Sequence, residues 1–435
     1  MKLIVLLLAS FSFSAFASFP ELFGSSAGSL AVGNQAEADS AANNYFAGAL
    51  LGYSKSTKYS FNVFHVQTDF KDIKNVTVKN DMTSVNQLES GSPEMNLTPT
   101  MMFGAHLSTP LFSDLGPKLN LSIFAPFDRL MEASSGDPYQ PNYVMYESRI
   151  IRPIINFSLA QNFNRWSFAL GGQTSFQSNG ESYFVTRTTS GTSSVGKVSF
   201  NAKPSLGFVG SMAYKTENTV SYLALQQEMK SQFHNSATGE TEIASNASLP
   251  FDFKVTSLLY YDPLIVRAGH QIQSEQRNIL FSLEYQKWDN YEASTLKLKQ
   301  QGGTINGSNN LEDIKLKNIF IPKIGLVEKL NDQWDLKLGY FYRPSPIKTS
   351  NLKNAGNSID ADKHVGSLGA AYNFMMYGKK LTLDLAYQGH ILKNEKITKT
   401  PNREDGDPGQ PKIGSPGYRI GGMIHTLALG LSWTI

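Results

Sequence analysis

The chain has 435 residues, a length that fits either several soluble domains or one long β-barrel. Its 39 Lys and Arg residues nearly balance its 36 Asp and Glu residues, and no basic cluster stands out, so we expect no nucleic-acid partner. Cysteine is absent, which excludes disulfide bonds, thiolate catalysis and thiolate metal ligands.

The first 17 residues are typical of a secretory signal peptide. Lys2 precedes an apolar run at residues 3–8, and small residues flank Phe16. We expect cleavage before Ser18, which places the mature protein outside the cytoplasm. No later stretch approaches the roughly 18 consecutive apolar residues of a membrane-spanning helix, so membrane insertion would have to use strands.

Residues 18–56 do not follow the strand pattern of the rest of the chain. Residues 24–49 are rich in Ala, Gly, Ser and Asn, with short helical possibilities. A barrel of fourteen strands, as predicted below for residues 57–435, has a lumen that stays open unless something fills it. We therefore predict that residues 18–56 form a plug, or hatch, inside the barrel.

The remainder alternates apolar and polar residues, the pattern of strands with two different faces. In residues 333–340, for example, Trp334, Leu336 and Leu338 would face lipid. An even number of strands is typical of bacterial barrels. The fourteen predicted strands span residues 57–70, 98–111, 118–128, 146–160, 166–178, 198–213, 219–231, 251–272, 278–290, 316–330, 334–344, 364–376, 381–391 and 419–435.

The connections also alternate. Those after even-numbered strands are tight, as at residues 113–117 and 331–333, whereas those after odd-numbered strands are long and polar, which places them outside the cell. Pro263 interrupts the eighth strand and cannot donate a ladder hydrogen bond, so residues 251–261 are an alternative separate strand. Because a split would spoil the even count, we predict one continuous strand. The last strand ends the chain inside the sheet and closes the barrel.

Several segments of the chain are similar, in sequence and in order, to segments of one known family. Residues 23–39 read FGSSAGSLAVGNQAEAD, residues 123–128 read IFAPFD, and Trp288 follows the strand-end segment LEY. Residues 339–346, GYFYRPSP, are followed by SIDADKH at 358–364 and LGAAY at 368–372. Together they resemble the FadL-type family of outer-membrane transporters for long-chain fatty acids and other hydrophobic compounds.

The resemblance implies an all-β fold, a fourteen-stranded antiparallel transmembrane β-barrel with a small N-terminal plug, in the outer membrane of a Gram-negative cell. It also implies facilitated diffusion by a monomer that contacts outer-membrane lipid and binds fatty acids or other hydrophobic molecules, without cofactor, metal or enzymatic activity. The alternatives are a porin for polar solutes and, less favoured, an outer-membrane lipid hydrolase.

Candidate ligand contacts follow from the needs of an amphiphile, which are an apolar pocket and a cation for a carboxylate. Apolar candidates are Phe19, Leu22 and Phe23 in the plug, and Phe124 and Phe127 on the third strand. Packing of the plug against the wall is an equal alternative for Phe19 and the favoured interpretation for Leu22. The resemblance implies that an Arg near the fifth strand and a Lys entering the tenth hold the head group. The nearest matches are Arg187 and Lys317, whose alternative is a solvated loop charge.

Pro126 lies in the predicted third strand, where it removes a ladder donor and favours a kink or bulge. The resemblance implies a lateral opening at this point, and we assign it to Ala125 and Pro126. The alternative is a proline tolerated at a strand end.

Two other groups of residues are weaker candidates for a functional site. Glu404, Asp405 and Asp407 lack the further oxygen ligands of a calcium site and are interpreted as a solvated loop. His106 and Ser108 share one strand face, as a hydrolase would need, but no third residue that orients the histidine can be named.

Overall fold

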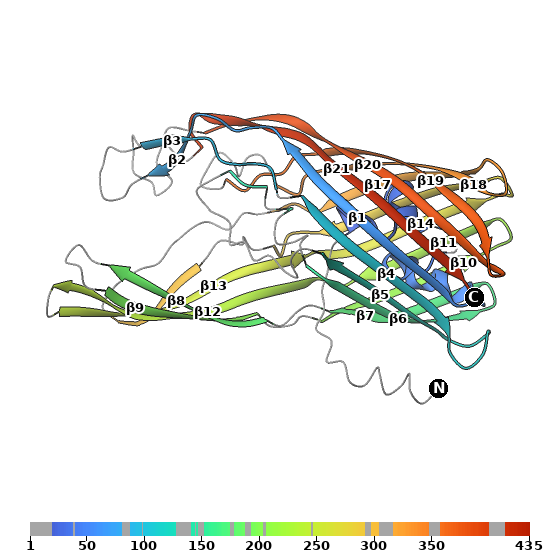
Figure 1. Ribbon diagram of the computed structural model, residues 1–435, viewed down its shortest axis with the longest axis horizontal. Coiled ribbons are helices and arrows are strands. Elements are labelled where there is room, and N and C mark those ends of the chain that lie inside the picture. Colours follow the sequence, from blue (N-terminus) through green and yellow to red (C-terminus); the bar gives the residue numbers. More distant parts are fainter. Residues whose placement is uncertain are drawn as a thin grey trace.

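The computed structural model describes residues 20–37, 40–80, 88–97, 99–127, 141–143, 145–146, 152–174, 178–187, 193–202, 206–244, 247–291, 297–303, 316–347, 357–399 and 414–435. Within these residues, fourteen antiparallel strands form a closed barrel (Figure 1). The predicted fold class and strand number are confirmed. The predicted signal peptide, Phe19 and the acidic loop at 404–407 lie outside the described residues.

Every barrel strand pairs with its sequence neighbours in the barrel, and the last strand pairs with the first, from Lys58 opposite Thr434 to Phe70 opposite Gly422. The barrel strands are β1 (Lys58–Phe70), β4 (Thr100–Pro110), β5 (Lys118–Pro126), β6 (Ile154–Phe163), β7 (Trp166–Thr174), β10 (Leu206–Lys215), β11 (Thr219–Gln226), β14 (Leu264–Gln273), β15 (Arg277–Lys287), β17 (Ile319–Lys329), β18 (Trp334–Arg343), β19 (Lys363–Met376), β20 (Lys379–Thr398) and β21 (Gly417–Thr434).

The two faces of the strands have the predicted chemistry. On β18, Trp334, Leu336 and Leu338 are exposed on the outer face while Lys337 between them is buried in the lumen. Three aromatic pairs mark the end of the barrel that carries the short turns: Tyr59 with Trp433, Trp166 with Tyr214, and Trp334 with Tyr372, their ring centroids 5.0, 4.8 and 4.9 Å apart. Such rings are typical of a membrane–water interface.

The long connections at the other end form structure that the sequence pattern did not predict. A five-stranded sheet in the order β16-β13-β12-β9-β8 projects from the barrel, and β2 and β3 form a separate hairpin (Figure 1). The strands are β8 (Ser178–Arg187), β9 (Ser193–Ala202), β12 (Met229–Ala244), β13 (Ala247–Asp262), β16 (Lys297–Gly303), β2 (Val76–Asn80) and β3 (Leu88–Gly91).

The single strand predicted for residues 251–272 is wrong. β13 ends at Asp262 and β14 begins at Leu264, so Pro263 separates two strands. The barrel nevertheless keeps its even count, because β13 belongs to the projecting sheet and only β14 to the barrel. A residue between two strands needs no ladder partner, so proline is tolerated at this position.

The N-terminal segment forms α2 (Pro20–Phe23), α3 (Ala27–Ala31), α4 (Asn43–Ala47) and the 3-10 helix η1 (Gly48–Tyr53). Ser26 caps α3 by accepting a hydrogen bond from the backbone N–H of Ser29. These helices contact β1, β5, β6, β7, β10, β11 and β18 to β21, and neighbouring residues of the segment bond to β14, β15 and β17. Since these strands surround the segment, it lies inside the barrel (Figure 1).

No helix in the described ranges is long and apolar enough to span a membrane.

Candidate functional site

The N-terminal segment, called the plug from here on, is seated on glycines of the wall. Gly33 has a φ of 78°, a conformation that favours glycine, and its backbone lies against Gly339 of β18. A Cβ on Gly339 would lie 2.1 Å from the Gly33 nitrogen, and one on Gly325 of β17 would lie 2.7 Å from the Val32 carbonyl oxygen. Larger residues at these wall positions would therefore displace the plug.

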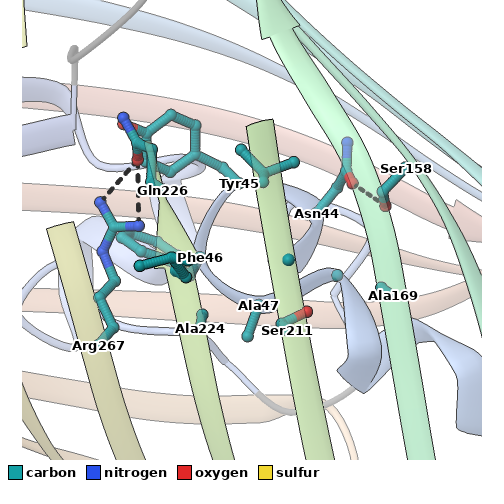
Figure 2. A pocket seen from close by; sticks show the side chains of 14 residues that line it. Asn44, Tyr45, Phe46, Ala47, Ser158, Ala169, Ser211, Ala224, Gln226 and Arg267 are labelled. Carbon is teal, nitrogen blue, oxygen red and sulfur yellow. Dashed lines mark hydrogen bonds between the residues drawn. The ribbon is translucent and has the colours of Figure 1, made fainter. Parts of the chain in front are cut away.

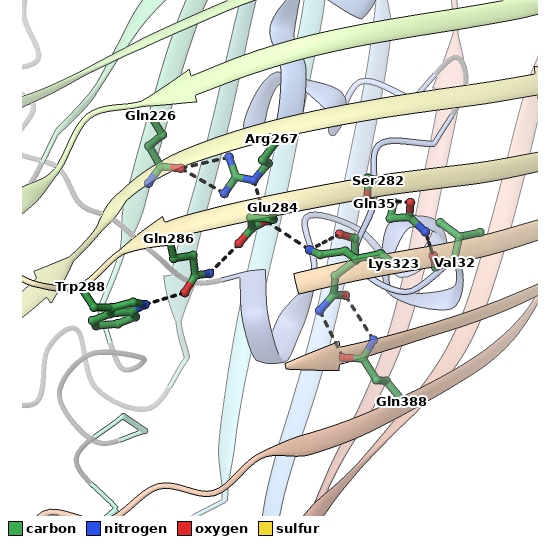
Figure 3. A network of polar contacts seen from close by, with 11 residues as sticks. Val32, Gln35, Gln226, Arg267, Ser282, Glu284, Gln286, Trp288, Lys323 and Gln388 are labelled. Atoms are coloured by element: carbon green, nitrogen blue, oxygen red, sulfur yellow. Dashed lines mark hydrogen bonds and ion pairs between the residues drawn. The ribbon is translucent and has the colours of Figure 1, made fainter. Parts of the chain in front are cut away.

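A charged network joins the plug to β14, β15 and β17 (Figure 3). Arg267 Nε and Lys323 Nζ lie 2.9 and 3.2 Å from the same carboxylate oxygen of Glu284. Lys323 also donates to the Asn34 carbonyl oxygen of the plug at 3.0 Å. All three charged side chains are less than a tenth exposed, so two buried cations share one buried anion.

A second ion cluster holds the plug on the neighbouring strands β18 and β20. Lys337 of β18 pairs with Glu37 of the plug and, at 2.8 Å, with Asp384 of β20. Gln388 of β20 donates to the Leu30 carbonyl oxygen at 3.3 Å. The plug is thus fixed by charged contacts from β15 round to β20.

On the β4 to β6 side the contacts are between neutral polar groups. Asn44 of α4 donates to Ser122 at 3.2 Å and accepts from Ser158 at 2.6 Å. His106 Nδ1 lies 2.8 Å from the Ser122 hydroxyl, whereas Ser108 donates to Asn120 at 2.7 Å. The structure therefore does not pair His106 with Ser108, and the catalytic arrangement considered from the sequence is absent at these two residues.

Between α4 and strands β10, β11 and β14 lies a cavity of about 20 Å³, called the seam cavity here (Figure 2). Its lining combines polar Asn44, Tyr45, Gln226 and Arg267 with small residues such as Ala47, Gly48, Ala169 and Ala224. The Arg267 guanidinium lies 5.4 Å from the Tyr45 ring centroid and donates from both terminal nitrogens to the Gln226 side-chain oxygen at 3.2 Å.

Two polar atoms of this lining have no hydrogen-bond partner. They are the Tyr45 hydroxyl and the Gln226 side-chain nitrogen, in residues only 3% and 2% exposed. The assignment of the Gln226 amide follows from its oxygen, which accepts from Arg267. Buried polar groups without a protein partner cost free energy and are unusual in folded proteins.

The residues predicted to make apolar contacts with the ligand lie on both faces of the barrel wall. Leu22, Phe23 and Phe124 are buried in the lumen. Phe124 packs edge-on against Tyr45, with centroids 6.0 Å apart. Phe127, in contrast, is 58% exposed and contacts Phe103, which stacks on Phe61 of the outer face, so the structure does not bring it to the lumen.

The two predicted head-group cations lie in different parts of the structure. Lys317 lies two residues before the start of β17 and lines a second cavity of about 190 Å³, together with Ser345, Ile347, Asp360, Asp362, Lys393 and Glu395. Because three carboxylates line that cavity, an anion there would meet repulsion as well as attraction. Arg187 is the last residue of β8 in the projecting sheet. The structure does not bring the two together, and their role in binding stays a prediction.

Ala125 and Pro126 are the last two residues of β5. They still pair with β4, where Pro126 lies opposite Met102, but the ladder between β5 and β6 ends at Phe124 opposite Ile154. The proline is therefore at the strand end, beyond the last ladder pair between β5 and β6.

At the loop end of the barrel, Phe70 of β1 stacks on Tyr143, with ring centroids 3.9 Å apart. The Tyr143 hydroxyl donates to the Gly421 carbonyl oxygen at 3.2 Å and accepts from the Gly421 N–H at 3.0 Å. Burial raises the pKa of Tyr143 to about 12, so the donor stays protonated at neutral pH. This contact attaches the loop segment to β21.

These features define an outer-membrane β-barrel whose lumen is occupied by its own N-terminal segment. The chain belongs to the family of outer membrane protein transport proteins (OMPP1/FadL/TodX), whose model matches residues 5–414. The predicted family and location are thereby confirmed, and the family consists of transporters of hydrophobic compounds.

One curated relative and two solved structures illustrate the similarity. Over 171 residues the chain is 28% identical to alkane uptake protein A of Marinobacter nauticus. This match covers 38% of this chain and 37% of that protein. A Pseudomonas aeruginosa FadL homologue has a TM-score of 0.61 at 15% identity, covering 97% of this chain and 99% of that one. The P. putida toluene transporter TodX has a TM-score of 0.54 at 14% identity, covering 95% and 98%. The structural similarity shows the fold.

Sequence reasoning missed Tyr45, Gln226 and Arg267. They are far apart in the chain and meet only because α4 lies against β11 and β14 inside the barrel. A partial signal was available, since the alternation of period two places Gln226 and Arg267 on the lumen-facing sides of β11 and β14.

Proposed function

We propose that the protein carries long-chain fatty acids or other hydrophobic compounds passively across the outer membrane, and releases them sideways through the barrel wall. The observation that carries the proposal is the occupied lumen, because a plug bonded to strands all around the barrel leaves no wide aqueous route for polar solutes. The names of relatives, an alkane uptake protein and a toluene transporter, support the hydrophobic class of substrate.

An uptake assay tests the transport step. Cells that lack their own transporter of this class would be given radiolabelled palmitate, hexadecane or glucose with and without this protein. We expect the protein to accelerate entry of at least one hydrophobic compound severalfold and to leave glucose entry unchanged. Faster glucose entry with no change for either hydrophobic compound would contradict the proposal and favour a polar-solute porin.

Sideways release is supported by the end of the β5–β6 ladder. Above the pair Phe124–Ile154, Ala125 and Pro126 have ladder partners on β4 alone. An unpaired backbone group facing hydrocarbon costs several kcal/mol, so such an interruption must be bounded by loop, plug or passing ligand. This is the position at which a substrate could leave the lumen without crossing a complete ladder.

A cross-link tests sideways release. Antiparallel register places position 153 opposite position 125, so cysteines in an Ala125→Cys, Pro153→Cys double variant would join β5 to β6 above the last ladder pair. With no native cysteine to interfere, we expect oxidation to reduce hydrophobic uptake at least tenfold and reduction to restore it.

The matched control joins strands that are already paired. Cysteines at Ala105 and Ile123, which lie opposite each other on β4 and β5, should leave uptake unchanged in either redox state. Undiminished uptake through a verified 125–153 cross-link would show that the substrate leaves by another route.

A further inference from the structure

The cavity of about 190 Å³ at the loop end of β17 to β20, called the rim cavity from here on, has an almost wholly polar lining. We propose that it binds a sugar, an uncharged ring with several hydroxyl groups. The proposal is independent of which compound the barrel transports. Four neighbouring strands supply the lining, with Lys317 before β17, Ser345 and Ile347 after β18, Asp360 and Asp362 before β19, and Lys393 and Glu395 in β20.

The rim cavity lies just beyond the lipid-facing part of the wall. Ile391 of β20 is exposed on the outer face, opposite His364 of β19, and Lys393 follows it by two residues. The Lys393 N–H donates to the Asp362 carbonyl oxygen at 2.8 Å, which joins the two segments. The cavity is therefore at the level of the outer-leaflet head groups, where a glycolipid or a free sugar can reach it.

The local backbone brings the charged groups together. The pairing of β20 with β21 shifts register between Leu392 and Glu395, opposite Gly421, whose φ of 141° favours glycine. Such a bulge changes the direction of the side chains that follow it, so Lys393 and Glu395 both line the cavity. The carboxylate of Asp362 is fixed in place, because its oxygens accept from the Ser345 N–H at 2.8 Å and the Tyr342 hydroxyl at 2.9 Å.

The spacing of the charged groups leaves places for ligand hydroxyls. Lys393 Nζ lies 3.9 Å from an Asp362 oxygen and 3.6 Å from a Glu395 oxygen. Both distances exceed the range of about 2.7–3.2 Å for a hydrogen bond, so a small polar group can bridge each pair. An ammonium only donates and a carboxylate only accepts, whereas one hydroxyl does both. A hydroxyl therefore meets the need of both partners with a single atom.

The charges of the rim cavity balance, which favours a neutral ligand. Asp360 faces Arg343 at 3.1 Å and Lys363 at 3.8 Å, so its charge is compensated behind the lining. The remaining charged residues of the lining are two cations and two anions, namely Lys317, Lys393, Asp362 and Glu395. A ligand with a net charge would meet repulsion from one of these pairs.

The volume sets the size of the ligand. At about 30 Å³ for each water in the liquid, 190 Å³ corresponds to roughly six water molecules. One sugar ring with its hydroxyls occupies a similar volume, whereas a long alkyl chain does not fit and would meet polar groups on every side. The cavity therefore suits the sugar and not the tail of a glycolipid.

The test uses purified full-length protein in phosphatidylcholine nanodiscs. Glucose would be titrated and its binding followed by saturation-transfer NMR. Parallel nanodiscs would contain glucosyl diacylglycerol or plain diacylglycerol, with bound lipid counted by native mass spectrometry. We expect glucose to bind at millimolar concentration. Retention of the glucosyl lipid at least fivefold over diacylglycerol, with release by glucose, would identify a membrane glycolipid as the source. Binding of glucose alone would identify a free sugar, and binding of neither would overturn the proposal.

Two variants and a second probe test the assigned contacts. Lys393→Met removes the bridging donor and Glu395→Gln removes a charged acceptor, so each should weaken glucose binding about tenfold. Unchanged affinity in both variants would overturn the proposal. Glycerophosphoethanolamine, a zwitterion of similar size, should bind more weakly than glucose, because its opposite charges lie at separate ends. Tighter binding of this probe would replace the sugar by a zwitterion and overturn the proposal as well.

Lys287→Met is the matched control. Lys287 and Asp289 are two residues apart, like Lys393 and Glu395, and their charged atoms are also 3.6 Å apart, but they lie at the loop end of β15. Glucose affinity should be unchanged in this variant. An equal loss in Lys287→Met and Lys393→Met would show a general effect of surface charge and contradict the site. Since binding is measured without transport, a failure of uptake and a failure of this site are separate results.

Discussion

Deletion of residues 18–56 is expected to turn a nearly silent barrel into an ion-conducting pore. The segment fills a lumen that fourteen strands leave wide, and the wall behind it carries polar residues such as Asn62, Gln271 and Gln388 that water would solvate. Planar-bilayer recordings should show large steady currents for the deletion variant and rare, small events for the intact protein.

A second deletion of similar size controls for the loss of chain. Replacing residues 175–205, which include the projecting hairpin β8–β9, by a short linker removes material outside the lumen and should leave the barrel silent. Large steady currents from the intact protein would instead mean that the plug does not close the lumen, as a polar-solute porin would behave.

Glu284→Gln should be strongly destabilising. The substitution keeps the shape of the side chain but leaves Arg267 and Lys323 without their shared anion in a buried site. Removing one partner of a buried ion pair typically costs about 3–5 kcal/mol of unfolding free energy. Urea titration in lipid or detergent, followed by tryptophan fluorescence, would measure the change.

Glu328→Gln is the matched control for this effect. Glu328 also pairs with an arginine, Arg277, at 2.5 Å, but these side chains are 26% and 55% exposed. Surface pairs contribute little because water solvates each partner well, so the urea midpoint should hardly move. Similar shifts in the two variants would contradict the view that burial makes the Glu284 network important.

The barrel could be predicted from the sequence because the pattern that indicates each strand is local. Each lipid-facing residue such as Leu336 is next to a lumen residue such as Lys337, so the alternation of period two identifies the strand and its faces together. The short turns then determine the neighbours of each strand. Thirteen of the fourteen barrel strands were predicted with bounds within eight residues of those observed, whereas the eighth was predicted to begin 13 residues too early.

The projecting sheet was not predicted as a separate sheet. β8, with the sequence SNGESYFVTR, is mixed along its length and was interpreted as a polar loop, whereas parts of β9 and β13 fell inside predicted barrel strands. The eighth strand was misassigned for a related reason. The sequence shows that Pro263 interrupts the ladder, but only pairing between distant segments decides that β13 joins another sheet.

The candidate site, too, was predictable from the sequence only in part. The sequence by itself determined that residues 18–56 lack the strand pattern, but it did not single out Gln226 or Arg267. Only the tertiary structure placed Tyr45 beside them, because this contact joins the plug to strands about 180 residues or more away. Glu284 lies between two cations because three neighbouring strands bring Arg267, Glu284 and Lys323 together. Periodicity reports the face of a strand on which a residue lies. It carries no information on how a plug of short helices is rotated inside the lumen, which packing against wall glycines such as Gly339 decides.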